Sequence, residues 1–337
     1  MSQTVTTRCA TLRDGRRLSY VSIGPADGLL VLYLHGAIGS PQAICPELEA
    51  IVCDLRLRYV MVSRPGFGSS PPAAGRTLLG FARDAAALAD GLGHERFTVL
   101  GVSAGGPYAL ACAHELPERV AAAAVVSCLA PGTCSLLGRP APARAALRAL
   151  RTHPGACARA GDAAVRIAQG HPRFVARVMR AAAAPADRRQ LAGPEASEGA
   201  SARFLAAAGG GVQGLIDDHL LCARPWGFRP EAVSPLVDVW HGAQDRIVPV
   251  EDVLLLAAAL PRARIALDAD EGHFFFHHRR REILVQLADA ARQSSKSGRG
   301  SAASTTSSPS SAVCTMSSSW SARPSSSTCV SSRRAFS

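Results

Sequence analysis

Several common features are missing from this sequence, and each absence excludes a class of protein. No stretch of about 18 apolar residues is free of charges and helix breakers, so we expect no membrane span. The first residues, MSQTVTTRCATLRDGRRL, lack the apolar core of a secretory signal, and we therefore expect a cytoplasmic protein. The ten cysteines include no CxxC pair, so neither a disulfide framework nor a zinc site is indicated.

Acidic residues are scarce, with 26 Asp and Glu against 37 Lys and Arg, but the imbalance is local. Residues 294–337 carry five basic residues and no acid, and residues 131–230 carry 14 arginines against six acids. The remaining segments, which hold the motifs described below, are close to neutral. A basic surplus confined to two segments only weakly supports a polyanionic partner, so we expect no nucleic-acid partner.

Short apolar runs alternate with amphipathic segments over most of the chain. Runs typical of buried strands occupy residues 29–36, 58–66, 97–103, 120–129, 236–242 and 263–270. Helical spacing of apolar residues occurs at 77–93, 106–117, 251–261 and 278–293. An edge hairpin is expected over residues 11–23. This alternation predicts an α/β fold with a mostly parallel sheet and helices on both faces.

Two segments interrupt the alternation. Residues 131–230 contain Ala/Arg-rich helical patches and no clear strand, which predicts a helical cap inserted into a core of residues 1–130 and 231–293. From residue 294 onward serine supplies 19 of 44 residues, and no apolar periodicity remains. Such a composition buries too little apolar surface to offset its ordering entropy, so residues 294–337 are predicted to be a disordered tail.

The most informative motif is Gly101-Val102-Ser103-Ala104-Gly105, which lies between a predicted strand and the helix that follows it. A serine nucleophile at such a junction occupies a strained turn with positive φ. Side chains two residues before and after it would collide with the neighbouring strand or helix, and Gly101 and Gly105 remove them. The motif therefore predicts Ser103 as a nucleophile.

A serine nucleophile needs a base and donors for the developing oxyanion. We choose His273, which follows the last predicted strand, as the general base. The other candidate, His35, ends the strand at 29–36 and is expected to hold the next loop by hydrogen bonds instead. The backbone N–H groups of Ala37, in that loop, and of Ala104 are predicted to form the oxyanion hole.

Asp245 follows the strand at 236–242 and is predicted to orient His273. Both residues then lie on loops at the carboxyl ends of parallel strands, where open α/β sheets bind ligands. The competing acids lie inside a predicted strand or too near His273 in sequence to reach behind its ring: Asp238, Asp268, Asp270 and Glu271. The alternative interpretation is that Asp245 only caps the helix that follows.

The motifs occur in an order typical of one superfamily: HGAIGS (35–40), SRPGFGSS (63–70), GVSAGG (101–106), HGAQDRIVP (241–249) and EGH (271–273). Across residues from about 12 to 292 the chain resembles capped serine esterases and lipases of the α/β-hydrolase superfamily. The resemblance implies a Ser103, Asp245, His273 triad, a cap over the site, and hydrolysis without cofactor or metal. Ser63 departs from the pattern, since many relatives carry an acid there, but this loop is structural and the triad assignment is unaffected.

We expect hydrolysis of a small carboxylic ester through an acyl-enzyme. The same residues would also serve hydrolysis of a thioester, amide, lactone or carbon–carbon bond, or perhydrolysis, and the sequence of the cap does not decide among them. Serine at position 103 argues against the dehalogenase and epoxide-hydrolase chemistry of an aspartate nucleophile. A ligand-binding receptor on the same scaffold is the non-enzymatic alternative, although all three triad candidates are present. The oligomeric state stays open.

Overall fold

The computed structural model describes residues 6–37, 44–131, 141–208 and 211–300, and within these ranges eight strands form one sheet. The strands are β1 (Arg8–Thr11), β2 (Arg17–Ile23), β3 (Leu29–Leu34), β4 (Leu57–Val62), β5 (Phe97–Val102), β6 (Val120–Val126), β7 (Val237–Gly242) and β8 (Ala263–Asp268). Their order is β1-β2-β4-β3-β5-β6-β7-β8, with β1–β2 and β2–β4 antiparallel and the other pairs parallel. The mostly parallel sheet predicted from the sequence is confirmed.

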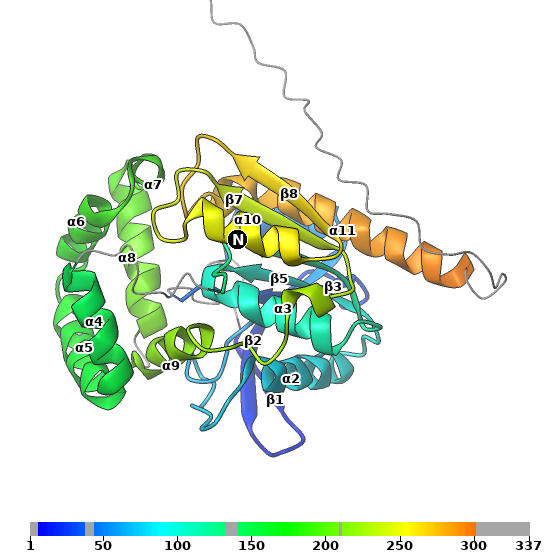
Figure 1. Cartoon of the computed structure of the whole chain (residues 1–337), viewed down its shortest axis with the longest axis horizontal. Coiled ribbons are helices and arrows are strands. Elements are labelled where there is room, and N and C mark those ends of the chain that lie inside the picture. The colour runs from blue at the N-terminus through cyan, green and yellow to red at the C-terminus, as the bar shows by residue number, and fades with distance from the viewer. Residues whose placement is uncertain (1–5, 38–43, 132–140, 209–210, 301–337) are drawn as a thin grey trace, which may run out of the picture. The chain divides into compact units, whose positions relative to one another are not determined.

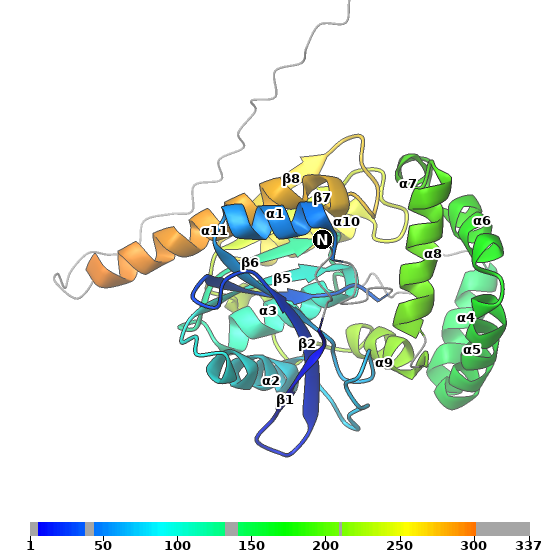
Figure 2. The ribbon, with the colours of Figure 1, turned by 180° about the vertical axis from the view of Figure 1, so that it is seen from behind.

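Helices cover both faces of this sheet (Figures 1 and 2). On one face lie α2 (Leu78–Gly91), α3 (Gly106–Glu115) and α10 (Val250–Ala259), and on the other α1 (Pro46–Asp54) and α11 (Phe276–Gly300) lie side by side. Each face buries its own apolar cluster. The central strands β5 and β6 are therefore apolar on both sides, as strands covered on both faces must be.

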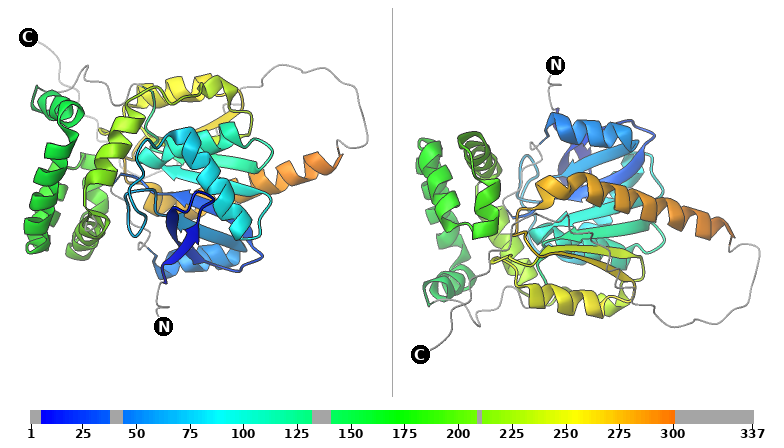
Figure 3. Two further views of the ribbon diagram at one scale, coloured as in Figure 1. Left: turned by 90° about the horizontal axis from the view of Figure 1, so that it is seen from below. Right: turned by 90° about the horizontal axis from the view of Figure 1, so that it is seen from above.

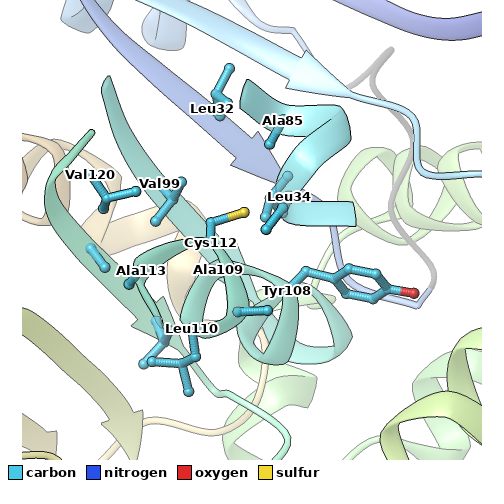
Figure 4. Close-up of a cluster of buried hydrophobic side chains, with 14 of the residues drawn as sticks. Leu32, Leu34, Ala85, Val99, Tyr108, Ala109, Leu110, Cys112, Ala113 and Val120 are labelled. Carbon is cyan, nitrogen blue, oxygen red and sulfur yellow. The ribbon is translucent and has the colours of Figure 1, made fainter. Parts of the chain in front are cut away.

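The helix α3 packs closely on the centre of the sheet (Figure 4). Its small residues Ala109 and Ala113 are fully buried, and they let the helix approach β5 and β6. Burial of apolar side chains at this density leaves little room for movement. The strand β5 and the helix α3 consequently form a rigid support for the turn between them.

Between β6 and β7 the described chain is helical. The helices are α4 (Ala141–Thr152), α5 (Pro154–Gln169), α6 (Pro172–Ala182), α7 (Pro185–Gln190), α8 (Pro194–Ala208) and α9 (Gln213–Cys222). The helix α8 lies between the sheet and the outer helices α4, α5 and α6 (Figures 1 and 3). The helices expected in this insertion are observed, while the boundary between core and cap stays a prediction.

The helix α11 continues to Gly300, beyond Ser294, where the tail was predicted to begin. Arg96 donates a hydrogen bond to Ser294 Oγ at 2.8 Å. Because extending an existing helix costs less free energy than starting a new one, the polar residues after Gln293 continue α11. Residues 301–337, the rest of the predicted tail, lie outside the described residues. None of the described helices has the length and hydropathy needed to cross a membrane.

Candidate active site

The turn that carries Ser103 requires glycine on both sides. Ser103 begins the short 3-10 turn η1 (Ser103–Gly105) and has a φ of +51°. A Cβ on Gly105 would collide with the carbonyl oxygen of Leu34 in β3, and a Cβ on Gly101 would collide with the carbonyl oxygen of Gly105. The steric reason predicted for the two glycines is therefore present in the structure.

The structure brings Ser103, His273 and Asp245 together in one hydrogen-bonded chain. His273 Nε2 lies 3.0 Å from Ser103 Oγ, and His273 Nδ1 lies 2.7 Å from Asp245 Oδ2. In this arrangement Nδ1–H donates to the carboxylate, and the serine hydroxyl donates to Nε2. All three residues are less than a tenth exposed. Residues far apart in sequence thus have the geometry of a nucleophile, a base and an orienting acid.

The two oxygens of Asp245 have different partners. Oδ1 accepts the backbone N–H groups of Ile247 at 2.7 Å and Val248 at 2.9 Å, while Oδ2 faces His273. Burial alone would raise the pKa of Asp245, but the hydrogen bond and charge of His273 and the N–H of Val248 bring it below its usual value. The carboxylate therefore stays ionised. Through Oδ1 it holds the turn before α10, and through Oδ2 it holds the His273 ring.

Two of the competing acids are bound to arginines. Asp238 receives a bidentate pair from Arg264 at 2.6 and 2.9 Å. Asp268 accepts from Arg279 at 2.6 Å. Within the described part of the chain, Asp245 is the carboxylate whose side chain bonds the His273 ring.

The predicted oxyanion donors lie on two loops beside Ser103. The strands β3 and β5 are parallel neighbours with Leu34 opposite Gly101, so the loops after them leave the sheet at the same edge. A Cβ on Gly36 would lie 3.4 Å from the Cβ of Ser103, which puts the chain leading to Ala37 against the nucleophile. Ala104 is buried directly after it. Residues 38–43, which complete the HGAIGS motif, lie outside the described residues.

The buried guanidinium of Arg64 holds the loop after β3. It donates to the carbonyl oxygens of His35 and, at 3.4 Å, of Gly36. On its other side it forms an ion pair of 2.6 Å with Asp218, in the inserted helix α9. Neither side chain is exposed to solvent, so the pair connects the inserted helices directly to the loop after β3.

Asp218 was not singled out from the sequence, although it is the centre of this network. Its carboxylate also accepts the Tyr108 hydroxyl at 2.6 Å and pairs with Arg76 at 2.8 Å. Burial raises the pKa of Asp218, but the charges of the two arginines and the Tyr108 hydrogen bond lower it further than burial raises it. The sequence carries no clear signal for it, because the buried positions of α9 do not form an apolar stripe: Gly214, Ile216, Asp218 and Cys222.

His35 has the geometry of a structural residue. Its Nδ1 lies 2.7 Å from the carbonyl oxygen of Gly36, and its ring packs edge-on against Phe67 with 4.7 Å between centroids. Burial, together with the nearby charge of Arg64, lowers the pKa of His35 to about 3. A histidine with so little proton affinity is a poor general base.

A large cavity exists away from Ser103. It has a volume of about 840 Å³ and is lined by residues of the β1–β2 turn, of α2 and of the segment before α2. Two of its lining arginines already form ion pairs, Arg16 with Asp84 and Arg119 with Asp90, each at 2.7 Å. The charge in this cavity is largely neutralised, and it offers no group comparable to Ser103.

The described residues contain no group of three or more His, Cys, Asp or Glu side chains arranged to hold a metal ion. The cysteines among them are free thiols. Burial raises the pKa of Cys112 and Cys128 well above the usual range of a thiol. These thiols stay protonated and packed in the core, so the candidate nucleophile is the serine.

Comparison with known families agrees with the observed fold. Residues 30–279 match the family model described as alpha/beta hydrolase fold. The chain belongs to this family.

Solved structures with the same fold span nearly the whole length of the chain. An alpha/beta hydrolase fold protein from Nakamurella multipartita is 22% identical with a TM-score of 0.64, covering 85% of this chain and 99% of its own. An esterase from Exiguobacterium antarcticum is 16% identical with a TM-score of 0.58, covering 84% and 100%. A thermophilic esterase from Thermogutta terrifontis is 23% identical with a TM-score of 0.56, covering 87% and 98%. At sequence identities this low, the similarity shows that these proteins share the fold.

Proposed function

We propose that this chain is a serine hydrolase that cleaves a small carboxylic ester through an acyl-enzyme. One observation carries the proposal: the continuous hydrogen-bonded chain from Asp245 through His273 to Ser103, with distances of 2.7 and 3.0 Å. Two of the similar structures are esterases by name, which supports ester chemistry for the same fold.

In the proposed reaction Ser103 Oγ attacks the ester carbonyl carbon while His273 Nε2 takes the hydroxyl proton. The carbonyl oxygen becomes an oxyanion and accepts hydrogen bonds from the N–H groups of Ala37 and Ala104. Collapse of this intermediate breaks the bond to the alcohol oxygen, which receives the proton from His273. Water, deprotonated by His273, then attacks the acyl carbon and forms a second tetrahedral intermediate. Its collapse breaks the bond to Ser103 Oγ, which takes back the proton from His273, and the carboxylic acid leaves.

Asp245 has no covalent role in this scheme. It holds the proton-bearing Nδ1 side of the ring, so that Nε2 is free to accept the proton of Ser103. Its ionised state also favours the imidazolium that forms during attack. The backbone N–H bonds from Ile247 and Val248 fix the direction of the carboxylate, which supports this function.

The test is a panel of p-nitrophenyl esters of increasing acyl length, assayed with and without a serine-directed fluorophosphonate. We expect turnover of the short esters, its loss on fluorophosphonate treatment, and mass-spectrometric labelling at Ser103. The matched control is Ser70→Ala, because Ser70 is a buried serine that binds only the backbone and Ser19. This variant is expected to be labelled at Ser103 like the wild type.

Other outcomes would lead to a different function. Labelling at Ser103 without turnover of any ester in the panel would exclude small esters and favour one of the other bonds that this triad cleaves. A folded protein that is neither labelled nor active would contradict the enzyme proposal and favour the receptor alternative.

A further inference from the structure

The short cap helix α7 contacts the loop that carries the candidate base. This base loop, defined as residues 269–275, connects β8 to α11. Asp187 Oδ1 accepts the backbone N–H of Phe274 at 2.9 Å. Two further contacts come from the end of the helix: Arg189 donates to the carbonyl oxygen of Asp270, and Gln190 donates to Glu271 Oε2 at 2.8 Å.

Asp187 is the unusual member of this group. It is 1% exposed, and no Lys or Arg of the described residues is among the groups that shift its pKa. Burial raises the pKa of Asp187, and the backbone N–H groups of Phe274 and His273 offset this only in part. A carboxylate buried without a cation is costly, so its position is not explained by stability.

The carboxylate of Asp187 also fits closely against the backbone before His273. A Cβ built on Gly272 would lie 2.6 Å from Asp187 Cγ, so the acid occupies the space that a side chain at position 272 would take. On the other side of the loop, Ser127 Oγ donates to the carbonyl oxygen of His273 at 3.0 Å. The backbone around His273 is therefore held from the end of β6 and from the cap.

We propose that Asp187 is a positioning residue for His273, through which the cap helix α7 keeps the base loop in the geometry needed for proton transfer. This inference rests on the proposed function, because it assumes that His273 is the base. Asp187 accepts the backbone N–H of Phe274, which belongs to the peptide that follows His273. Loss of this hydrogen bond would free that peptide, and with it the position of the His273 ring relative to Ser103. Displacements of about 1 Å at such a site cost about 100-fold in rate.

Asp187 could influence His273 through its charge or through its hydrogen bond. The ionisable groups that act on it are His273 and Asp245, both in the triad, and Arg189 and Glu271 hold the same loop. A carboxylate acting through its charge would lose its effect in an asparagine variant. A carboxylate acting through its hydrogen bond keeps an acceptor oxygen in that variant. We assign Asp187 the second role.

The experiment measures the rate of fluorophosphonate labelling of Ser103, which requires no knowledge of the natural substrate. Asp187→Ala is expected to slow labelling by about 10- to 100-fold, and Asp187→Asn by no more than a few-fold. The matched control is Asp162→Ala, since Asp162 also binds a backbone N–H, that of Val212 at 2.8 Å, but entirely within the cap. The control should label at the wild-type rate. Circular dichroism at the assay temperature establishes that each variant is folded.

Two further readouts separate positioning from general destabilisation. With an ester substrate, Asp187→Ala should lower kcat and leave KM within about threefold, since binding groups are unchanged. Gly272→Ala, which pushes a methyl group into the carboxyl of Asp187, should also slow labelling. In the double variant the methyl group at position 272 no longer meets the carboxyl of Asp187. The double variant should therefore be labelled no more slowly than the slower of the two single variants.

The possible results are distinct. If the wild type is not labelled at all, the proposed function fails, and this inference fails with it. If the wild type is labelled and Asp187→Ala is labelled equally fast, Asp187 does not position the base. Equal losses in Asp187→Ala and Asp187→Asn would show an effect of charge and would overturn the hydrogen-bond role.

Discussion

Arg64 and Asp218 form an ion pair of 2.6 Å in which neither side chain reaches solvent. One partner comes from the turn after β4 and the other from the inserted helix α9. The arginine also binds the carbonyl oxygen of His35, so the pair bridges the inserted helices and the loop after β3. Removing one member of a buried pair leaves the other charge without compensation, which is more damaging than losing both.

Asp218→Ala should therefore destabilise the protein strongly. The buried Arg64 and the partly buried Arg76 lose their shared carboxylate, and we expect a loss of about 3–5 kcal/mol in the free energy of unfolding. Urea denaturation followed by circular dichroism measures it. The neighbouring Asp217→Ala is the control, because Asp217 accepts a hydrogen bond from the Gln213 side chain at 2.6 Å and acts on Arg76 through its charge alone. Equal effects of the two substitutions would contradict the importance of the buried pair.

The same network predicts a pH dependence of stability. The folded protein lowers the pKa of Asp218 below its ordinary value of 3.8, so the ionised form favours folding. Its contribution is complete well above pH 3.8 and is lost as the pH falls through the folded pKa. The difference in unfolding free energy between the wild type and Asp218→Asn should thus be largest near neutral pH and shrink below about pH 4. A difference that grows on acidification would have the wrong sign.

The three triad candidates have different functions and should respond differently to substitution. Ser103→Ala removes the nucleophile and should lower turnover by about 10⁶-fold. Asp245→Asn keeps the shape of the side chain but favours the wrong histidine tautomer, and we expect a loss of about 10⁴-fold. Initial rates with the best p-nitrophenyl ester measure both. Near-normal turnover in folded Asp245→Asn would remove this residue from the proposed triad.

A comparison of the two histidines tests the choice of base. His273→Ala should abolish proton transfer and lower turnover by about 10⁶-fold, as removal of a catalytic histidine does. His35→Ala should act through the shape of its loop and keep a rate within about 100-fold of the wild type. The assay is turnover of one ester by both folded variants. If His35→Ala were the more damaging of the two, His273 would be the wrong assignment.

The turn of Ser103 provides a steric prediction. Gly105→Ala forces a methyl group into the carbonyl oxygen of Leu34, and this oxygen belongs to the backbone of a central strand. We expect a loss of more than about 3 kcal/mol in unfolding free energy, because backbone on both sides resists movement. Gly91→Ala, with open space around its Cβ, is the control and should be neutral or slightly stabilising. Thermal unfolding compares the two.

The sequence predicted the core of the fold well because its signals are local. The apolar runs at 97–103 and 120–129 correspond to β5 (Phe97–Val102) and β6 (Val120–Val126), where burial on both faces requires continuous apolar residues. The helix α1 was not predicted, although Pro46 at its start and glutamates in its first turn favour a helix there. Nine residues with weak periodicity gave too small a signal.

The triad candidates were predictable because each follows a strand, and the carboxyl ends of parallel strands meet at one edge. Asp187 and Asp218 were not predictable in the same way. Each lies on a cap helix, and its function depends on which segment of the core that helix contacts. Nothing in the local sequence of Pro185–Gln190 indicates that its one acid, Asp187, reaches the backbone beside His273. Such contacts are decided by the packing of distant segments.

The two buried cap carboxylates affect how this protein can be engineered. Asp218 contacts the loop after β3 through Arg64, and Asp187 contacts the base loop directly. A chimera that receives the cap of another family member would lose both contacts even if its helices packed well. It would need matching acids at both places, or compensating changes at Arg64 and Gly272. Point substitutions that leave Asp187 and Asp218 in place therefore disturb the two loops less than an exchange of the whole insertion.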